Sequence, residues 1–400
     1  MSATALEPQV LVAGGGPVGC LFAARLAQAV GPGLAIAVVD RGPLPPVGGP
    51  FDPRVVALNE ASRRLLAECG LWDRVADQAT PYRRMEVWDG EGTGHIAFDC
   101  REWDRPDLGH ILGVAPLVEA ARRRLAELGV VLVESAIVAA ERSRPGGPLQ
   151  LVLADGRRLT APLVVGAEGA RSLVRQACGV GLVERDTGQD AVVCAALVER
   201  PHGGAARQWF TRSGPLAFLP VTRPGGDPRA VAVVWSLARP EAERLAALDE
   251  AAFRRRLTAA SESTLGAVTE VGPRLQSPLC QRHAERYWAS GAALIGDAAH
   301  TLHPLAGQGV NLGLADAAAL AEVLARGVAR GLPVDHPSLL ARYERRRRAD
   351  NLLMLAAMEA FQHLFGSRAP ALVVARNWGL GLVDRLPLLK GALVRRALGV

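Results

Sequence analysis

Residues 9–41 of the sequence, QVLVAGGGPVGCLFAARLAQAVGPGLAIAVVDR, decide the fold. The run QVLVA predicts a short buried strand that leads directly into a glycine-rich turn. VGCLFAARLAQAV follows with the pattern of a helix, and GPG ends it. LAIAVVDR then predicts a second strand. The segment is therefore a strand–helix–strand unit, which is the building block of a parallel sheet.

Three glycines of this turn form the pattern G-x-G-x-x-G. Gly14 suits a tight turn, Gly16 lets the backbone approach a diphosphate, and Gly19 permits close packing of the helix. The helix N-terminus offers N–H groups to the phosphates, and Asp40 follows at the end of the second strand to bind ribose hydroxyls. The pattern predicts a dinucleotide and leaves NAD and FAD both open. A glycine-rich turn without a ligand is the less favoured alternative.

A second stretch, ALIGDAAHTLHPLAGQGVNLGLADAAAL at residues 293–320, separates the two cofactors. Asp297 follows the predicted strand ALIG, where its carboxylate can accept a hydrogen bond from the ribityl chain of a flavin. The loop 304–309 then begins a helix predicted over residues 310–324. Its N–H groups and the helix dipole would stabilise negative charge at N1 and O2 of a reduced flavin. The alternative is a tight loop before an ordinary core helix.

Two histidines of this stretch, His300 and His303, are candidates for a catalytic role together with Pro304. They would either relay a proton or brace the loop. Bracing is favoured, because a histidine beside a loop proline is often structural. No side chain is required as a nucleophile, and no cluster of metal ligands is expected.

The composition excludes several classes of protein. Nearly half of the 400 residues are apolar, which is enough for a large core without disulfide bonds. The six cysteines are scattered without a C-x-x-C pair, which argues against a zinc site and fits a reducing compartment. The net charge is +6, yet aromatic residues are scarce and no nucleic-acid motif occurs. We therefore expect no nucleic-acid partner.

The rest of the chain predicts alternating helical and β-rich regions. We expect a helical stretch within residues 52–76, one strand over 130–141, a β-rich region over 190–238, a helical region over 241–260 and a long arginine-rich helix over 338–364. Within the last of these, Arg345 to Arg348 predict a solvated helix face with ion pairs. The coarse organisation is an α/β nucleotide lobe interrupted by a mostly antiparallel β lobe.

Several motifs together resemble the single-component flavin aromatic hydroxylases: GGGPVG (14–19), RVVALN (54–59), GAEGARSLVR (166–175) and GDAAHTLHPLAGQGVNLGLADA (296–317). Further segments resemble one group within them, the ubiquinone-biosynthesis ring hydroxylases UbiH, UbiF and UbiI; they include MEVWDGEGTGHIAFD (85–99) and YERRRRADNLLMLAAMEAF (343–361). The resemblance covers nearly the whole chain. Two departures are Glu168, where the family carries Asp, and Gly113-Val114, where it often carries Glu-Asn.

The resemblance implies a fold of the para-hydroxybenzoate hydroxylase type. A Rossmann-like FAD-binding domain would comprise residues 1–80, 106–182 and 283–335. A mostly antiparallel β-sheet substrate domain would comprise residues 81–105 and 183–282. Residues 336–400 would form a C-terminal helical region.

The resemblance also implies roles for individual residues. The ADP half of FAD would be held by Gly14, Gly16, Gly19 and Asp40, with Arg54 near the phosphates or the flavin. Glu168 and Gly169 occupy a motif that serves both FAD and nicotinamide binding. Asp297 would hold the ribityl chain. The flavin ring would be lined by Pro304, Gly307, Gln308, Gly309 and Asn311.

The implied reaction is hydroxylation of the aromatic ring of a polyprenylated phenol in ubiquinone biosynthesis. NAD(P)H would reduce FAD, O₂ would form a C4a-hydroperoxyflavin, and its distal oxygen would attack the ring. A reductase of the same fold is one alternative. A non-catalytic structural member of a quinone-biosynthesis complex is the other.

We expect the protein to be cytoplasmic, because the N-terminus lacks a signal segment and no apolar run reaches the ~18 residues of a spanning helix. Because the substrate is insoluble in water, two alternatives stay open for the protein. It would contact a ubiquinone-biosynthesis complex, or it would make peripheral contact with the inner membrane. The basic segment 373–400 predicts either two helices packed on the core, which we favour, or an interfacial segment.

Overall fold

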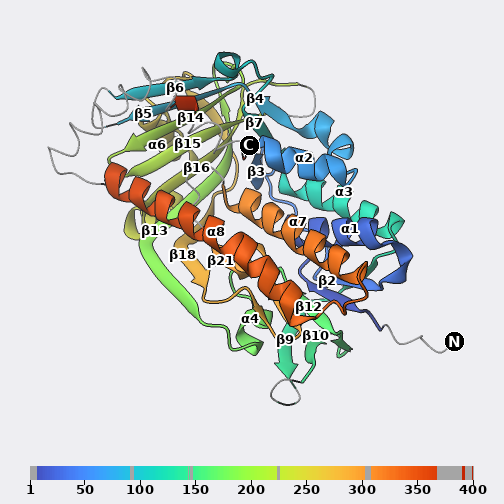
Figure 1. Ribbon diagram of the computed structural model, residues 1–400. Coiled ribbons are helices and arrows are strands. Elements are labelled where there is room, and N and C mark those ends of the chain that lie inside the picture. The colour runs from blue at the N-terminus through green and yellow to red at the C-terminus, as the bar shows by residue number, and fades with distance from the viewer. Residues whose placement is uncertain are drawn as a thin grey trace.

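The computed structural model describes residues 7–90, 94–142, 144, 147–222, 226–301, 308–366, 390–391 and 399, with the backbone alone for residues 308 and 361–366. Figure 1 shows two lobes, one with helices packed on a parallel sheet and the other built on a large twisted sheet. A long helix, α8 (Pro337–Gly366), runs along both lobes. The predicted fold class, an α/β nucleotide lobe with a mostly antiparallel β lobe, is confirmed.

Six strands form the sheet of the first lobe. Their order is β19 (Trp288–Ala289), β20 (Ala292–Leu294), β12 (Leu163–Gly166), β1 (Val10–Ala13), β2 (Ile36–Asp40) and β8 (Val131–Glu134). All neighbouring pairs are parallel except β19–β20 at the edge. Every residue of β1 is buried, because the strand lies inside a sheet whose faces are covered.

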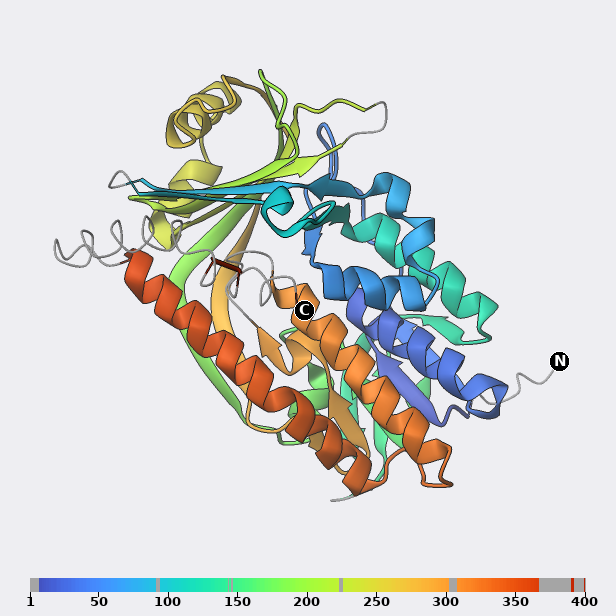
Figure 2. The ribbon, with the colours of Figure 1, turned by 45° about the horizontal axis from the view of Figure 1, so that its top comes forward.

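Helices α1 (Pro17–Val30), α3 (Val114–Glu127) and α7 (Gln308–Val328) lie side by side on the parallel sheet, with α1 in the middle (Figure 2). The unit β1–α1–β2 is the strand–helix–strand segment predicted from residues 9–41. A small sheet of β9 (Ile137–Arg142), β10 (Leu149–Leu153) and β11 (Arg158–Thr160) packs into the same core, and the short helix α4 (Leu173–Ala177) follows β12.

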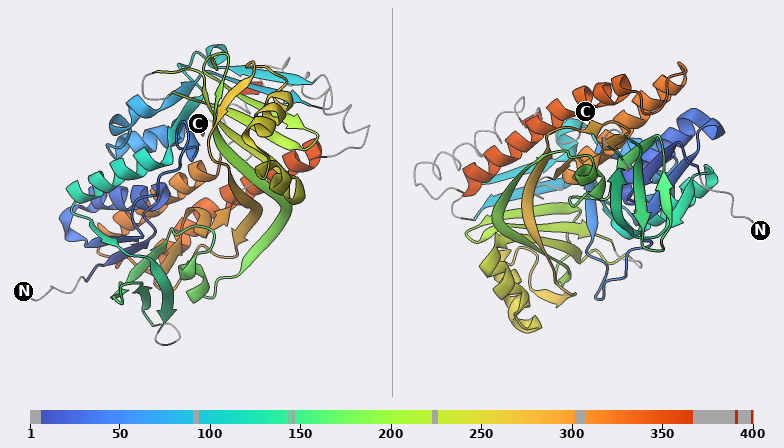
Figure 3. Two further views of the ribbon diagram at one scale, coloured as in Figure 1. Left: turned by 180° about the vertical axis from the view of Figure 1, so that it is seen from behind. Right: turned by 90° about the horizontal axis from the view of Figure 1, so that it is seen from below.

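The sheet of the second lobe is mostly antiparallel. Its order is β21 (His300–Thr301), β18 (Leu275–Ala284), β13 (Leu182–Val198), β16 (Ala230–Ala238), β15 (Gly214–Val221), β14 (Ala205–Thr211), β5 (Arg84–Asp89) and β6 (His95–Asp99), and β17 (Val268–Val271) pairs with β13. The β14–β5 pair is parallel. Helices α5 (Arg239–Ala246) and α6 (Glu250–Ala260) cover one face, where Trp209, Trp235 and Phe253 are buried (Figure 3).

Residues 52–76 differ from the sequence prediction of one helical stretch. Strand β3 (Val55–Leu58) comes first and pairs with β7 (Gly109–Gly113), which also pairs with β4 (Thr80–Tyr82). Helix α2 begins only afterwards, at Glu60, and ends at Glu68. The side chain of Asn59 starts it by accepting a hydrogen bond from the backbone N–H of Ser62.

Two further predictions were too coarse. Residues 130–141 form two strands, because β8 joins the parallel sheet and β9 pairs with β10 in another sheet. Residues 241–260 form the two helices α5 and α6, and Asp249 between them caps α6 by accepting a hydrogen bond from Ala252 N–H. Short 3-10 turns occur at Gly31–Gly33, Trp72–Arg74, Ala76–Gln78, Cys100–Trp103 and Gly296–Ala298.

Within the described ranges, none of the helices combines the length and apolar character needed to cross a bilayer.

Candidate active site

The glycine-rich turn after β1 has the geometry that its three glycines predict. Gly14 has a φ of +105°, and a Cβ there would lie 2.5 Å from the carbonyl oxygen of Ala167. A Cβ on Gly19 would collide with the carbonyl oxygen of Gly14. A Cβ on Gly16, in contrast, would meet no atom of the described residues within 4 Å. The outer two glycines are therefore required by packing, whereas Gly16 presents its backbone to open space.

The N-terminus of helix α1 faces this open space. Gly16 is its N-cap, no side chain caps it, and Pro17 is the first helical residue. In the part of the chain that the structure describes, no side chain accepts a hydrogen bond from the N–H groups of the first turn. They are available, with the positive end of the helix dipole, to a phosphate group.

Asp40 lies at the end of β2, directly beside the turn. Its Oδ2 atom accepts a hydrogen bond from Gly15 N–H at 2.8 Å, and its Oδ1 atom accepts one from Gly42 N–H at 3.0 Å. Each carboxylate oxygen has a second lone pair, so two further hydrogen bonds remain available. The backbone thus fixes the Asp40 carboxylate while leaving capacity for ribose hydroxyls.

Arg54 is held by Asp52, which sequence reasoning missed. The Nε atom of Arg54 donates to both carboxylate oxygens of Asp52, at 2.9 and 3.1 Å, and Nη2 donates to the carbonyl oxygen of Pro45 at 2.6 Å. The hydrogen bond to Asp52 raises the pKa of Arg54, so its charge is secure. Asp52, two residues earlier in the sequence, was the available signal for this local pair.

Glu168 follows β12 and supports the start of α4. Its Oε1 atom accepts hydrogen bonds from Ser172 Oγ and from Val174 N–H, each at 2.8 Å. Its Oε2 atom is buried and has no hydrogen-bond partner among the described residues, and burial raises the pKa of the carboxyl group. Gly169 has a φ of +89° and open space around its Cα. The N-cap of α4 is Ser172, and the Glu168 side chain supports this helix start while retaining one unused acceptor.

Asp297 lies in the 3-10 turn after β20, and its side chain is exposed. Desolvation by surrounding protein atoms nevertheless raises the pKa of its carboxyl group. The charges of His300 and Arg282 lower this pKa but do not outweigh the desolvation. The carboxylate is therefore accessible to a ligand, although protein atoms surround it. This is a suitable position for a carboxylate that accepts hydrogen bonds from a ligand's hydroxyl groups.

Close packing brings the Asp297 turn and the glycine-rich turn together. A Cβ on Gly313 of helix α7 would lie 2.7 Å from Val18 Cγ2 and 3.2 Å from the Cα atom of Gly296. A Cβ on Gly296 would lie 3.2 Å from Val18 Cγ1. The 3-10 turn and the start of α7 therefore meet the start of α1 around Val18. In sequence, α1 lies nearly 300 residues before them.

The predicted flavin-lining residues are placed only in part. His303, Pro304 and Gly307 lie outside the described residues. Gln308 begins helix α7, and a Cβ on Gly309 would meet no atom within 4 Å. The Asn311 side chain donates to the carbonyl oxygen of Ala57 at 2.8 Å and accepts from Asn59 N–H at 3.1 Å. Asn311 thus joins the first turn of α7 to β3.

His300 belongs to a buried polar network that sequence reasoning missed. Its Nε2 atom lies 2.5 Å from Oδ2 of Asp316, a fully buried residue of α7. The other members come from β18, the bend before β19, and α8: His283, Tyr287, Arg347 and Asn351. One signal was available, because Asp316 is the only charged residue among the alanines and leucines of residues 312–321.

A cluster of three or more His, Cys, Asp or Glu side chains that could hold a metal ion does not occur among the residues that the structure describes. The oxygen atoms and N–H groups described above instead fit the two ends of a flavin dinucleotide. The open position at Gly16 is next to the first helix turn and Asp40, and the turn that carries Asp297 packs against Val18.

Comparisons with known proteins show the family to which the chain belongs. A family model described as an FAD binding domain matches residues 7–356. The ubiquinone hydroxylase UbiL of Rhodospirillum rubrum is 37% identical over 393 residues, covering 98% of this chain and 89% of that protein. The 3-demethoxyubiquinol 3-hydroxylase of Escherichia coli is 36% identical over 397 residues, covering 98% of each chain.

A solved structure has the same architecture. The p-nitrophenol 4-monooxygenase PnpA of Pseudomonas putida DLL-E4 superposes with a TM-score of 0.79 over 98% of both chains. Its sequence is 21% identical to this one, so the likeness shows the fold alone.

Proposed function

The chain belongs to the FAD-binding domain family and, within it, to the ubiquinone-biosynthesis hydroxylases, and from this premise we propose that it hydroxylates the aromatic ring of a polyprenylated phenol. It is an FAD-dependent monooxygenase, with NAD(P)H and O₂ as co-substrates. The observation that carries the proposal is the sequence identity of 36–37% to the two hydroxylases named above, over 98% of the chain. That coverage includes the second lobe, which is where hydroxylases of different substrates are expected to differ.

FAD, when bound, accepts a hydride from NAD(P)H and activates O₂, so the protein itself need supply no nucleophile. Its residues must bind the cofactor and keep it in place. The first turn of α1 would hold the diphosphate, Asp40 the ribose and Asp297 the ribityl chain. The start of α7, with Gly309 and the positive end of its dipole, would face the flavin ring. These assignments, with those of Arg54, Glu168, Gly169, Pro304, Gly307, Gln308 and Asn311, are part of the proposal.

The second lobe offers a wall for the substrate. Val193, Ala217 and Val234 are neighbours across strands β13, β15 and β16, and each is only half-buried. They alternate with residues that pack under α5 and α6, so they point to the opposite face. On this same face, Ala195 approaches Gly272, which packs against Pro50 of the first lobe. We assign this apolar face to the ring and prenyl tail of the substrate.

The domain boundaries predicted from sequence remain part of the proposal. So does the cellular setting: a cytoplasmic enzyme that meets its insoluble substrate in a ubiquinone-biosynthesis complex or at the inner membrane. The segment 373–400, which would provide an interfacial contact, lies almost entirely outside the described residues.

The test is a spectrum of the purified protein followed by NAD(P)H oxidation under air, with and without a prenylphenol. The proposal expects bound flavin, NAD(P)H oxidation that the phenol stimulates, and a product heavier by one oxygen atom. Flavin-dependent reduction without a hydroxylated product, across phenols of different ring substitution, would indicate a reductase. A protein that cannot be loaded with FAD would leave only a structural role.

A further inference from the structure

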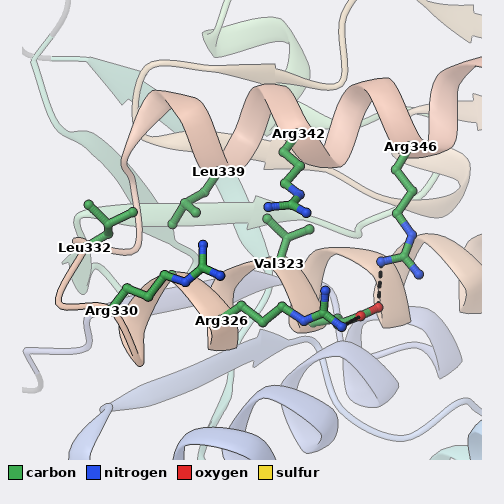
Figure 4. Close-up of a pocket in the computed structure, with 9 residues that line it drawn as sticks. Val323, Arg326, Arg330, Leu332, Leu339, Arg342 and Arg346 are labelled. Carbon is green, nitrogen blue, oxygen red and sulfur yellow. Dashed lines mark hydrogen bonds and ion pairs between the residues drawn. The ribbon is translucent and has the colours of Figure 1, made fainter.

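A cavity of about 360 Å³ lies between helices α7 and α8, at the end opposite the start of α7 (Figure 4). It is lined by Glu322, Val323, Arg326, Gly327, Arg330, Leu332, Leu339, Arg342 and Arg346. Val323 and Leu339 are buried and Leu332 is half-buried, whereas the four arginines are exposed. The cavity therefore has an apolar floor and a rim of guanidinium groups.

The charges of the rim do not balance. Glu322 is the single carboxylate that lines the cavity, and it already pairs with Arg326 at 2.5 Å and with Arg346 at 2.6 Å. Arg330 and Arg342 have no carboxylate partner among the residues that the structure describes. Figure 4 shows their guanidinium groups extending toward the cavity from opposite sides.

The backbone on both sides of the cavity is well fixed. The chain leaves α7 through a turn in which Gly331 has a φ of +77° and Leu332 N–H donates to the carbonyl oxygen of Gly327 at 3.0 Å. At Gly327 the two helices touch, since a Cβ there would lie 2.8 Å from Leu339 Cδ2. Arg330 therefore stands on an ordered turn, and Arg342 on the second turn of α8.

We propose that this cavity is a binding site for a phosphate-bearing anion. Four guanidinium groups around one carboxylate repel one another, and an anion removes that repulsion. Guanidinium groups bind phosphate oxygens through paired, charge-assisted hydrogen bonds, which makes arginine the preferred residue for such sites. The site is separate from the cofactor site and goes beyond the proposed function. The phosphate belongs either to an anionic phospholipid headgroup or to a free phosphate compound.

The test compares the double variant R330Q/R342Q with the control R200Q/R255Q, which removes two exposed arginines of the second lobe and the same total charge. Thermal unfolding of the full chain is followed at low salt, with inorganic phosphate or pyrophosphate added and with NaCl at equal ionic strength. Flotation with phosphatidylglycerol or phosphatidylcholine vesicles is measured in parallel. Glutamine keeps a polar side chain, with two N–H donors in place of five, and the substituted arginines are exposed, so folding should be preserved.

We expect phosphate or pyrophosphate to raise the Tm of the wild type and of the control beyond the effect of NaCl. The affinity of R330Q/R342Q should be at least about tenfold lower, because two charged hydrogen-bond donors are lost. Without anion, that variant should unfold at the same temperature as the wild type or higher, because repulsion is relieved.

The vesicles identify the source of the phosphate. Flotation with phosphatidylglycerol but not phosphatidylcholine, lost in R330Q/R342Q and retained in R200Q/R255Q, would assign the site to a lipid headgroup. Stabilisation by free phosphate without flotation would assign it to a free phosphate compound. If NaCl reproduces the whole effect, or if both double variants respond alike, the proposal is wrong.

Discussion

The Nε2 atom of His300 lies 2.5 Å from the Oδ2 atom of Asp316, and neither side chain is more than 1% exposed. Asp316 also accepts hydrogen bonds from Gly296 N–H at 3.2 Å, Arg347 Nε at 2.8 Å and Asn351 Nδ2 at 3.0 Å. Burial alone would raise the pKa of Asp316, but the charges of His300 and Arg347 outweigh it, and the pKa is lowered. One carboxylate thus joins α7 and α8 to the turn that carries Asp297.

Replacing Asp316 with Asn should destabilise the protein strongly. The variant leaves the buried Arg347 without its main counter-charge, a change that typically costs about 3–5 kcal/mol. The comparison is D350N, since Asp350 also pairs with Arg347, at 3.2 Å, but is 65% exposed. That control should cost less than about 1 kcal/mol. Urea unfolding of both variants measures the difference; equal values for the two would contradict a structural role for Asp316.

The pH dependence of stability should contain a contribution from His283. Desolvation is the main cause that lowers its pKa from 6.5 to about 4 in the folded protein. Between these values the unfolded chain binds a proton that the folded protein does not, so stability falls as the pH falls from about 6.5 to about 4. The total loss from this group is on the order of 3 kcal/mol, since one pKa unit corresponds to about 1.4 kcal/mol.

The variant H283Q should remove this contribution and flatten the profile of unfolding free energy between pH 6.5 and 4. H95Q is the matched control, because His95 is exposed on strand β6. Its profile should follow that of the wild type. A slope that persists unchanged in H283Q would show that other groups titrate in this interval.

Local pattern was enough to predict the first lobe but not every strand. The β1–α1–β2 unit was predictable because its glycines, helix and strands are adjacent in sequence. Strand β3 was missed because its partner β7 lies about 50 residues later, and the β-branched run of Val55 and Val56 was the only local sign. Likewise the break between β8 and β9 depends on which distant strands each one joins.

The local geometry of the candidate site was predictable where one short segment supplies it. The Gly14 turn and Asp40 belong to such a segment. The partners of Asp316 do not, since Tyr287 and Arg347 meet it only after the chain has folded. The run from Arg345 to Arg348 illustrates the limit: the sequence predicted a solvated face, but successive residues of a helix point in different directions, and Arg347 is buried against Asp316.

Gly16 should tolerate a methyl group in folding but not in cofactor binding. A Cβ at Gly16 meets no atom within 4 Å, and its φ of −71° suits any residue, so G16A should fold normally. The methyl group would lie where the diphosphate approaches the backbone, and FAD affinity should fall by at least about tenfold. G33A is the control, since a Cβ at Gly33 also meets no atom, near the other end of α1. The measurement is the flavin content of each variant after dialysis. Equal retention of FAD by G16A and G33A would contradict the role of Gly16 in binding the diphosphate.

Glu168 should be required for the length of its side chain rather than for its charge. Its Oε1 atom reaches both Ser172 Oγ and Val174 N–H, and E168D would withdraw the carboxylate by one methylene. Loss of these contacts at the start of α4 should cost about 0.5–2 kcal/mol, the usual effect of removing a helix cap. E184D is the comparison, because Glu184 is an exposed partner of Arg282 and should change stability by less than about 1 kcal/mol.

E168Q separates the two properties of Glu168. It keeps an amide oxygen that accepts hydrogen bonds from Ser172 and Val174. It also removes the charge of a carboxyl group whose pKa is raised by burial. The unfolding free energy of E168Q should therefore equal or exceed that of the wild type, because a buried charge with one unpaired oxygen is lost. Urea unfolding measures stability, and titration with FAD and NAD(P)H measures affinity. If E168Q unfolded as readily as E168D, α4 would require the charge of Glu168 as well as its reach.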